Sequence, residues 1–186
     1  MKVSIIIPCR NEEKHIRKTI DSIIRQDFNY EFEVIVVDGN SIDSTKEILY
    51  SYKKDIKNLI ILDNPDKIVP ISFNLGLTQS KGEYIIRVDA HSIIGKDFLK
   101  NCIKIINREG LDCVGGPTLH ISNGVVGDSI RICQTSKFGS GGVYFRNENT
   151  KGRYVDTLAF GAYKRSVFKS IGGYDEELIR NQDDEF

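Results

Sequence analysis

The chain contains 186 residues, of which 26 are Lys or Arg and 26 are Asp or Glu, so its formal net charge is zero at pH 7. This balance argues against a nucleic-acid-binding protein, which usually carries an excess of basic residues. A hydrophobic content of 40% with 28% charged residues excludes a disordered chain, and no apolar run approaches the roughly 18 residues of a membrane-spanning helix.

The charges are distributed unevenly along the chain. Residues 175–186 carry six acids and one base, a net charge of −5, which leaves +5 on residues 1–174. Acids that complement the dipole of a helix N-terminus account for one or two of these carboxylates but not for all of them. A carboxylate at this end is therefore a candidate general base.

The four cysteines, at positions 9, 102, 113 and 133, lack the C-x-x-C spacing of a zinc site or a redox pair. We interpret them as buried, reduced side chains, which predicts a cytoplasmic protein. No signal peptide is expected either, because Pro8, Arg10 and Glu12 interrupt the apolar N-terminal stretch.

Strands and helices are predicted to alternate over the first 116 residues. In chain order the pattern predicts strand 3–7, helix 16–24, strand 32–37, a helix capped at 43, strand 59–62, helix 70–79, strand 84–88, helix 98–110 and strand 113–116. Such alternation indicates right-handed β-α-β units. The expected fold class is therefore α/β, with a mostly parallel, Rossmann-like central sheet and helices on both faces.

Beyond Pro117 the pattern is looser. The glycine-rich segment 138–143 is predicted to be a loop, which either closes over a ligand or is a plain connection. Residues 155–163 predict a strand, and the helix after it ends at Gly172-Gly173. Residues 183–186 look like the start of another helix, so we expect the chain to be part of a longer protein.

Three polar clusters follow predicted strands, at 8–12, 38–45 and 89–91. In doubly wound sheets, ligands bind beyond the carboxyl ends of the strands, where the strand order reverses. The dinucleotide fingerprint G-x-G-x-x-G and the P-loop motif are both absent, which disfavours NAD-dependent oxidoreductases and P-loop NTPases. The clusters therefore predict a different kind of nucleotide site.

Asp89 and His91 form the sharpest of these features. If the strand continues through them, their side chains point the same way and can share a divalent ion with phosphate oxygens. The same pair also fits a strand end with a solvated histidine. Asp38 also allows two interpretations. An acid at the end of a buried strand can accept a hydrogen bond from a nucleobase, or it can close an Asx turn.

Taken in order, these segments resemble inverting family 2 glycosyltransferases of the GT-A fold. The matching motifs are IIIPCRNE at 5–12, VVDGNSIDST at 36–45, KGEY at 81–84 and DAH at 89–91. Further motifs resemble the succinoglycan-biosynthesis branch of that family, namely VGGP at 114–117, VDT at 155–157, FGAY at 160–163, IGGYDEE at 171–177 and NQDDE at 181–185. The resemblance spans nearly the whole chain.

This resemblance implies a single GT-A catalytic domain over 1–186, with a nucleotide-sugar-binding half (1–117) and an acceptor and catalytic-base half (118–186). It implies transfer of a sugar from a UDP-sugar to a hydroxyl of a saccharide or lipid-linked saccharide by a metal-assisted single displacement. The donor-binding residues would be Pro8, Arg10, Glu12, Asp38, Asn74 and Asp89. Asp38 would recognise the uracil.

Asp89 and His91 would hold Mg²⁺ or Mn²⁺, and Asp183 would be the catalytic base, with Asp184 as the second candidate. His91 replaces the usual aspartate, and Phe73 replaces an arginine found in many members of the family. The same resemblance implies a location in the cytoplasm, at the inner face of the membrane, with any membrane attachment made by regions absent from this chain.

Two other functions fit parts of the sequence. A catalytically silent nucleotide-sugar-binding module would use the same donor pocket without turnover. A nucleotidyltransferase would share the sheet architecture, but it should carry a glycine- and arginine-rich pyrophosphate loop after the first strand. The segment from Pro8 to Glu12 does not supply one.

Overall fold

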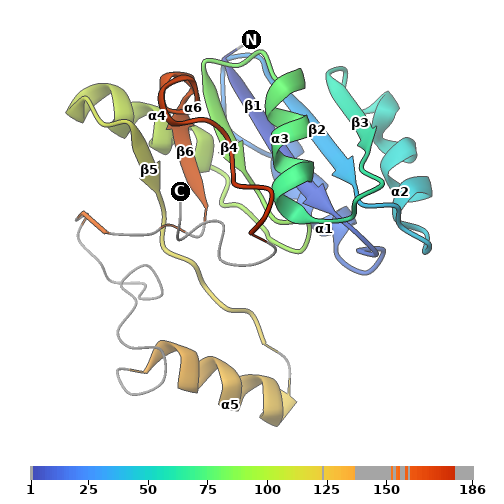
Figure 1. The fold of residues 1–186 in the computed structure, drawn as a ribbon. Coiled ribbons are helices and arrows are strands. Elements are labelled where there is room, and N and C mark those ends of the chain that lie inside the picture. The colour runs from blue at the N-terminus through green and yellow to red at the C-terminus, as the bar shows by residue number, and fades with distance from the viewer. Residues whose placement is uncertain are drawn as a thin grey trace.

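A six-stranded sheet forms the centre of the computed structural model, which describes residues 2–122, 124–136, 152, 154–155, 158 and 160–178 (Figure 1). Its strands are β1 Val3–Cys9, β2 Phe32–Asp38, β3 Leu59–Asp63, β4 Tyr84–Arg87, β5 Cys113–Gly115 and β6 Gly161–Lys164, in the order β3-β2-β1-β4-β6-β5. The first four strands pair in parallel, whereas β6 is antiparallel to both β4 and β5. The predicted α/β class with a mostly parallel sheet is confirmed.

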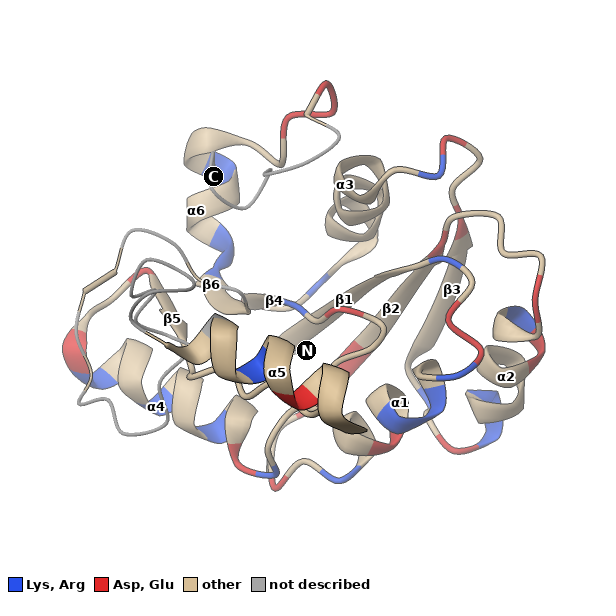
Figure 2. Ribbon diagram, turned by 90° about the horizontal axis from the view of Figure 1, so that it is seen from below, with Lys and Arg blue, Asp and Glu red and all other residues tan. Residues whose placement is uncertain are grey.

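Helices cover both faces of this sheet. They are α1 Ile16–Ile24, α2 Thr45–Ser51, α3 Val69–Gln79, α4 Phe98–Glu109, α5 Gly124–Thr135 and α6 Arg165–Ile171, with a short 3-10 turn, η1, at Tyr52–Lys54. Helices α1, α2 and α4 pack on one face, and α3 and α6 pack on the other (Figure 2). None of the described helices is long and apolar enough to cross a membrane.

The apolar periodicity of the sequence explains the main core. Ile16, Ile20 and Ile23 recur at helical spacing on α1, and all three are fully buried against β1 and β2. Helix α4 presents Leu99, Cys102, Ile103 and Ile106 to the same core and ends at Gly110, whose φ of 69° is left-handed.

Helix α3 lies on the opposite face and contains no charged residue, as Figure 2 shows. It approaches β1 closely at Gly76, where a Cβ atom would lie 2.6 Å from Cγ2 of Ile6. Phe73 and Ser72 are buried against the sheet, and Leu75 is partly exposed. Glycine at 76 therefore permits the contact that seats α3.

The structure departs from the sequence predictions mainly after Pro117. The strand predicted at 155–163 is shorter, because β6 begins at Gly161 and residues 155, 158 and 160 lie outside it. Helix α5 was not predicted, and it lies apart from the sheet beyond the carboxyl ends of the parallel strands (Figure 1). The loop predicted at 138–143 and the helix start at 183–186 lie outside the described residues.

Candidate active site

The strand order reverses between β1 and β4. From β1 the chain continues to β2 and β3 on one side, and then returns to β4 on the other side of β1. In open α/β sheets, ligands bind at such a switch point, beyond the carboxyl ends of the strands. The loops that follow β1, β2 and β4 meet at this edge, and they carry most of the residues predicted for the site.

Pro8 ends the pairing between β1 and β4. The carbonyl of Ile6 accepts a hydrogen bond from the N–H of Val88, and this is the last bond between the two strands. Residue 8 faces the same side of the strand as residue 6, and proline has no N–H with which to continue the ladder. Pro8 pairs in register only with Val37 of β2, so β1 and β4 separate here.

The loops after β1 and β2 are joined by side-chain hydrogen bonds. The N–H of Asn11 donates to Oγ of Ser41 (2.8 Å), and the N–H of Ile42 donates to Oδ1 of Asn11 (2.9 Å). The N–H of Glu12 donates to Oγ1 of Thr45 (2.8 Å). Asn11 has a φ of 54°, a left-handed conformation that asparagine tolerates better than most residues. These bonds hold Glu12 in a defined place above the sheet.

Asp43 also helps to join the loops after β1 and β2. It accepts bonds from the N–H of Glu13 (3.1 Å) and from both N–H and Oγ1 of Thr45 (3.1 and 2.5 Å). Burial raises the pKa of the Asp43 carboxyl, but the hydrogen bonds outweigh it, so that this pKa lies below its ordinary value. Asp43 and Thr45 thus act as structural residues of the loop, whereas the N-cap of α2 is Ser44 and not the predicted residue 43, and no side-chain hydrogen bond caps this helix.

Asp38 is fully buried at the end of β2. Its carboxylate accepts bonds from the N–H and Oγ of Ser41 (2.9 and 2.5 Å), and Nζ of Lys46 lies 3.5 Å away. Lys46 also pairs with Asp63 (2.7 Å), and this hydrogen bond, together with the charge of Asp38, raises the pKa of the lysine. Asp38 therefore closes the turn after β2, but through the N–H three residues on and not the N–H two residues on that an Asx turn uses. Recognition of uracil by Asp38 stays a prediction, and it requires Lys46 or the loop to move, because no part of the carboxylate is exposed.

The strand β4 ends at Arg87, and residues 90–91 form a turn. The strand therefore does not continue through Asp89 and His91, and the condition under which their side chains would point the same way is not met. Asp89 instead accepts a hydrogen bond from Arg87 (3.0 Å), a buried guanidinium whose side chain is 11% exposed. The main chain between the two residues is fixed from α1, because Oγ1 of Thr19 donates to the carbonyl of Ala90 (2.8 Å).

His91 contacts Glu12 across the switch point. Nδ1 of His91 lies 2.9 Å from Oε1 of Glu12. A carboxylate only accepts hydrogen bonds, so Nδ1 carries the proton, and in the neutral ring the lone pair is on Nε2. A histidine that donates one ring N–H to a carboxylate and presents its other nitrogen outward has the arrangement found at metal-ligating histidines. The arrangement of His91 fits a ligand of a divalent ion, with Glu12 orienting the imidazole, and joint ligation with Asp89 stays a prediction.

The remaining predicted residues lie in different places. Arg10 is exposed and lies over Gly39, where a Cβ atom would be 3.3 Å from that of Arg10. Asn74 bonds to the main chain of Tyr174 and to Glu176, on the α3 and α6 face of the sheet. Asp183 and Asp184 lie outside the described residues. No cluster of three or more potential metal-binding side chains occurs within the described part of the chain.

Sequence reasoning missed several residues that build this edge. They are Thr19, Ser41, Lys46 and Arg87. Arg87 offered a usable signal, because a charge inside an apolar strand must be paired when it is buried. Thr19 offered none, since its bond to Ala90 joins positions 71 residues apart.

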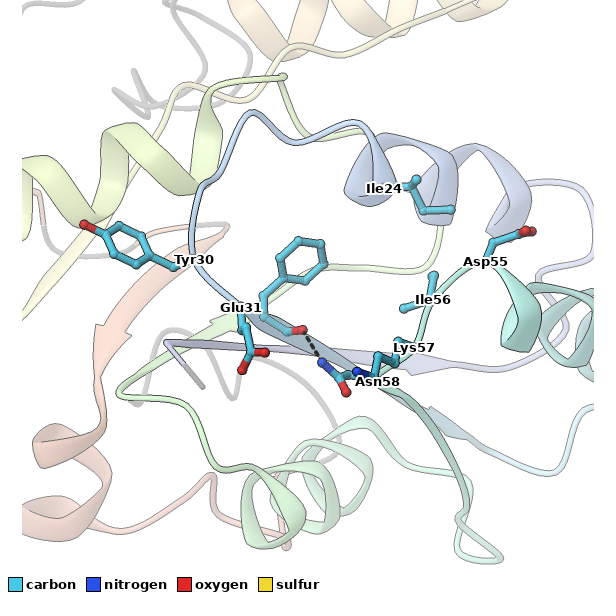
Figure 3. Close-up of a pocket in the computed structure, with 8 residues that line it drawn as sticks. Ile24, Tyr30, Glu31, Asp55, Ile56, Lys57 and Asn58 are labelled. Carbon is cyan, nitrogen blue, oxygen red and sulfur yellow. Dashed lines mark hydrogen bonds between the residues drawn. The ribbon is translucent and has the colours of Figure 1, made fainter.

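A hollow elsewhere in the described residues lies at the opposite edge of the sheet, at the start of β2 and β3 (Figure 3). Its lining residues are Ile24, Tyr30, Glu31, Phe32, Asp55, Ile56, Lys57 and Asn58. No residue of the candidate site lines this hollow. The polar edge at the switch point is therefore the better candidate.

Comparison with known proteins identifies the family of the chain. The model of "Glycosyl transferase family 2" matches residues 4–172. "Succinoglycan biosynthesis protein ExoA" of Rhizobium meliloti is 28% identical over 97% of this chain and 55% of its own length. A "dolichyl N-acetyl-alpha-D-glucosaminyl phosphate 3-beta-D-2,3-diacetamido-2,3-dideoxy-beta-D-glucuronosyltransferase" of Methanococcus voltae is 30% identical over 99% of this chain and 60% of its own length.

The crystal structure of S. aureus TarS 1-349 in complex with UDP superposes with a TM-score of 0.76 at 26% identity, covering 99% of this chain and 53% of that one. The chain thus spans between half and three fifths of the length of these proteins.

Proposed function

The chain belongs to glycosyl transferase family 2, and from this we propose that it transfers a sugar from a nucleotide-sugar donor to a hydroxyl acceptor in the synthesis of a cell-surface or secreted polysaccharide. The observation that carries the proposal is the contact between Glu12 and His91 across the switch point, beside Asp89. This contact supports the proposal because a histidine oriented by a carboxylate lies at the edge where α/β sheets bind ligands.

The proposed donor is a UDP-sugar. Support comes from the similarity to TarS, which was solved with UDP, and from the three polar strand ends that meet at one edge. Pro8, Arg10 and Glu12 would line the nucleotide pocket on the β1 side. Asp38 would face the base once Lys46 is displaced, and Asp89 would lie by the ribose and diphosphate.

The proposed cofactor is Mg²⁺ or Mn²⁺, held by Asp89 and His91. When bound, the ion would neutralise the charge on the departing nucleoside diphosphate. Arg87 keeps the Asp89 carboxylate in place, and Glu12 keeps the imidazole of His91 in the tautomer that can ligate. Since the described residues offer no third ligand nearby, phosphate oxygens would complete the coordination.

The proposed reaction is a single displacement that inverts the anomeric carbon. Asp183 would accept the proton of the acceptor hydroxyl as its oxygen forms a bond to C1 of the sugar. At the same time the bond from C1 to the diphosphate oxygen would break, and the electron pair would leave with the nucleotide. Asp184 is the second candidate for the base.

We further propose a saccharide or lipid-linked saccharide acceptor and a location at the cytoplasmic face of the membrane. The names of the relatives from Rhizobium meliloti and Methanococcus voltae support this acceptor class. The membrane location follows only from the family resemblance.

The full chain, incubated with a panel of UDP-sugars and Mn²⁺, should release UDP with at least one donor. Transfer to a saccharide acceptor would identify the sugar. Binding of UDP in a calorimeter without transfer or hydrolysis would favour the silent binding module. Failure to bind any nucleotide would refute the proposed function.

A further inference from the structure

The chain that follows α6 is fastened to α3 by one side chain. Asn74 accepts a hydrogen bond from the N–H of Tyr174 at Oδ1 (2.9 Å), and its Nδ2 donates to the carbonyl of the same residue (2.8 Å). The second proton of Nδ2 is donated to Oε1 of Glu176 (2.9 Å). One amide thus satisfies both main-chain groups of Tyr174, as a neighbouring strand would do.

Two glycines permit this contact. Gly172 ends α6 with a φ of 92°, a conformation that disfavours residues with a side chain. A Cβ atom on Gly173 would lie 2.2 Å from Oδ1 of Asn74, closer than any van der Waals contact. The Gly172-Gly173 pair therefore does more than end the helix, because the hydrogen bonds between Asn74 and Tyr174 also require glycine at these positions.

The ring of Tyr174 connects this turn to residues near the candidate site. It stacks on Phe73 with ring centroids 4.4 Å apart, and the guanidinium of Arg87 lies 5.8 Å from its centroid. Arg87 in turn donates to Asp89 (3.0 Å). A continuous set of contacts therefore joins Asn74 to Asp89 through Tyr174 and Arg87.

The fastened segment leads to the predicted base. Asp183 follows the last described residue of this segment, Leu178, by five positions, so a fully extended chain can carry it no more than about 18 Å from there. The turn at 173–176 therefore lies just before the stretch of chain that carries the acidic residues 183–185.

We infer that Asn74 is a positioning residue for the transfer step, because it holds the turn at 173–176, from which the chain continues to the proposed base, in a fixed relation to Asp89. The inference rests on the proposed function and replaces the predicted contact of Asn74 with the donor. A primary amide has two N–H groups and two acceptor lone pairs, and three of these four positions are already used.

The test compares Asn74→Ala with Thr78→Ala in the full chain. Thr78 is an exposed residue one turn further along α3, and its hydroxyl bonds only to its own helix, so it controls for a polar truncation on this surface. We expect Asn74→Ala to lower kcat by about 10²-fold, the cost of a misplaced catalytic group, with the UDP dissociation constant changed less than twofold. Thr78→Ala should match the parent in both.

Asn74→Asp keeps the size and the acceptor Oδ1 but loses both donors, so it should show the same loss of kcat even if the alanine variant folds poorly. Gly173→Ala should lower kcat in the parent but add little in the Asn74→Ala background, where the clashing oxygen is gone. This coupling would not be expected for two independent structural residues.

An unchanged kcat in both Asn74 variants would overturn the inference. Weaker UDP binding with an unchanged kcat would also overturn it and would restore the donor contact. If the parent chain itself transfers no sugar, the proposed function fails, and the inference fails with it; the parent measurement therefore separates the two failures.

Discussion

Asp183 is the residue on which the proposed chemistry depends most. Asp183→Asn replaces the carboxylate with an amide of nearly the same size that cannot accept a proton. General-base catalysis typically contributes about 10²- to 10⁴-fold, so kcat should fall on that scale while UDP binding is retained. Asp184→Asn is the matched control and should stay close to the parent. If Asp183→Asn transfers sugar at the parent rate, Asp183 is not the base. If only Asp184→Asn lowers kcat, Asp184 is the base instead.

The cysteines give a second test at this scale. Burial raises the pKa of the Cys9 thiol, with the charge of Asp38 adding to it, and burial raises the pKa of Cys102 and Cys113 to about 12. Thiolates are the reactive form, so these three should resist alkylation at pH 8. Cys133 is exposed on α5, so the interpretation of all four cysteines as buried is wrong for this residue. Iodoacetamide should therefore add one group to the native chain, at Cys133, and four groups after denaturation, as read by intact mass and peptide mapping. Rapid labelling of Cys9 would contradict its burial beside Asp38.

Some residue roles were predictable and some were not. The polar residues at strand ends could be predicted because the sequence itself shows an abrupt change from apolar to polar residues there. The sequence did not reveal which of these residues bind a ligand and which only hold the loops. For Asp38 this depends on its contacts with Ser41 and Lys46, which pattern alone does not show. The position of His91 depends on where β4 stops, and nothing in the local pattern distinguishes a strand that ends at 87 from one that ends at 91.

Among the elements, α1 acts as a support for the loop that follows β4. Besides Thr19, it offers Ser22 Oγ to the N–H of Ile94 (3.2 Å). Gln26, two residues beyond the end of α1, bonds to Gly95 and to the first turn of α4 at Leu99 (2.7 and 3.1 Å). This helix therefore binds the loop through polar side chains and binds the sheet through its isoleucines.

Thr19→Val removes the hydroxyl with little change of shape and leaves the buried carbonyl of Ala90 without its donor. An unsatisfied buried group costs about 1–3 kcal/mol, so urea unfolding should show a loss of that size. The proposed metal pair flanks Ala90, so UDP binding in Mn²⁺ should weaken more than UDP binding in a chelator. Thr78→Val, on the surface of α3, should change neither quantity. A stability equal to that of the parent would show that the bond contributes nothing.

The element predictions held where contacts are local in sequence. The alternation through 116 was predicted, because each strand and its following helix carry their own apolar period. Strand β6 was misjudged, since its short length and antiparallel direction come from partners at 84–86 and 113–115. Helix α5 was not predicted, because its apolar residues do not form the core-facing stripe that identifies a helix. Four of them are exposed, namely Val125, Val126, Ile130 and Ile132.

At the scale of the whole molecule, the two halves predicted from the sequence share one sheet. Strand β6, from the second half, lies between β4 and β5, which both belong to the first. The smaller core on the α3 face is also shared, since Ile6, Phe73 and Ile85 pack against Phe168 and Tyr174. Residues 1–117 and the described part of 118–186 therefore belong to a single folding unit.

A chain cut after residue 117 should accordingly fail to fold on its own. It loses β6, which pairs with β4 and is the strand to which β5 is hydrogen-bonded, and it exposes the apolar surface that Phe168 and Tyr174 cover. Circular dichroism should show no cooperative thermal transition, and calorimetry should show no UDP binding. A chain of residues 1–178 is the matched control, since it keeps β6, α6 and the turn fastened by Asn74 but lacks Asp183 and Asp184. It should unfold cooperatively and bind UDP without transferring sugar, whereas cooperative unfolding and UDP binding by 1–117 would show that the nucleotide half is independent after all.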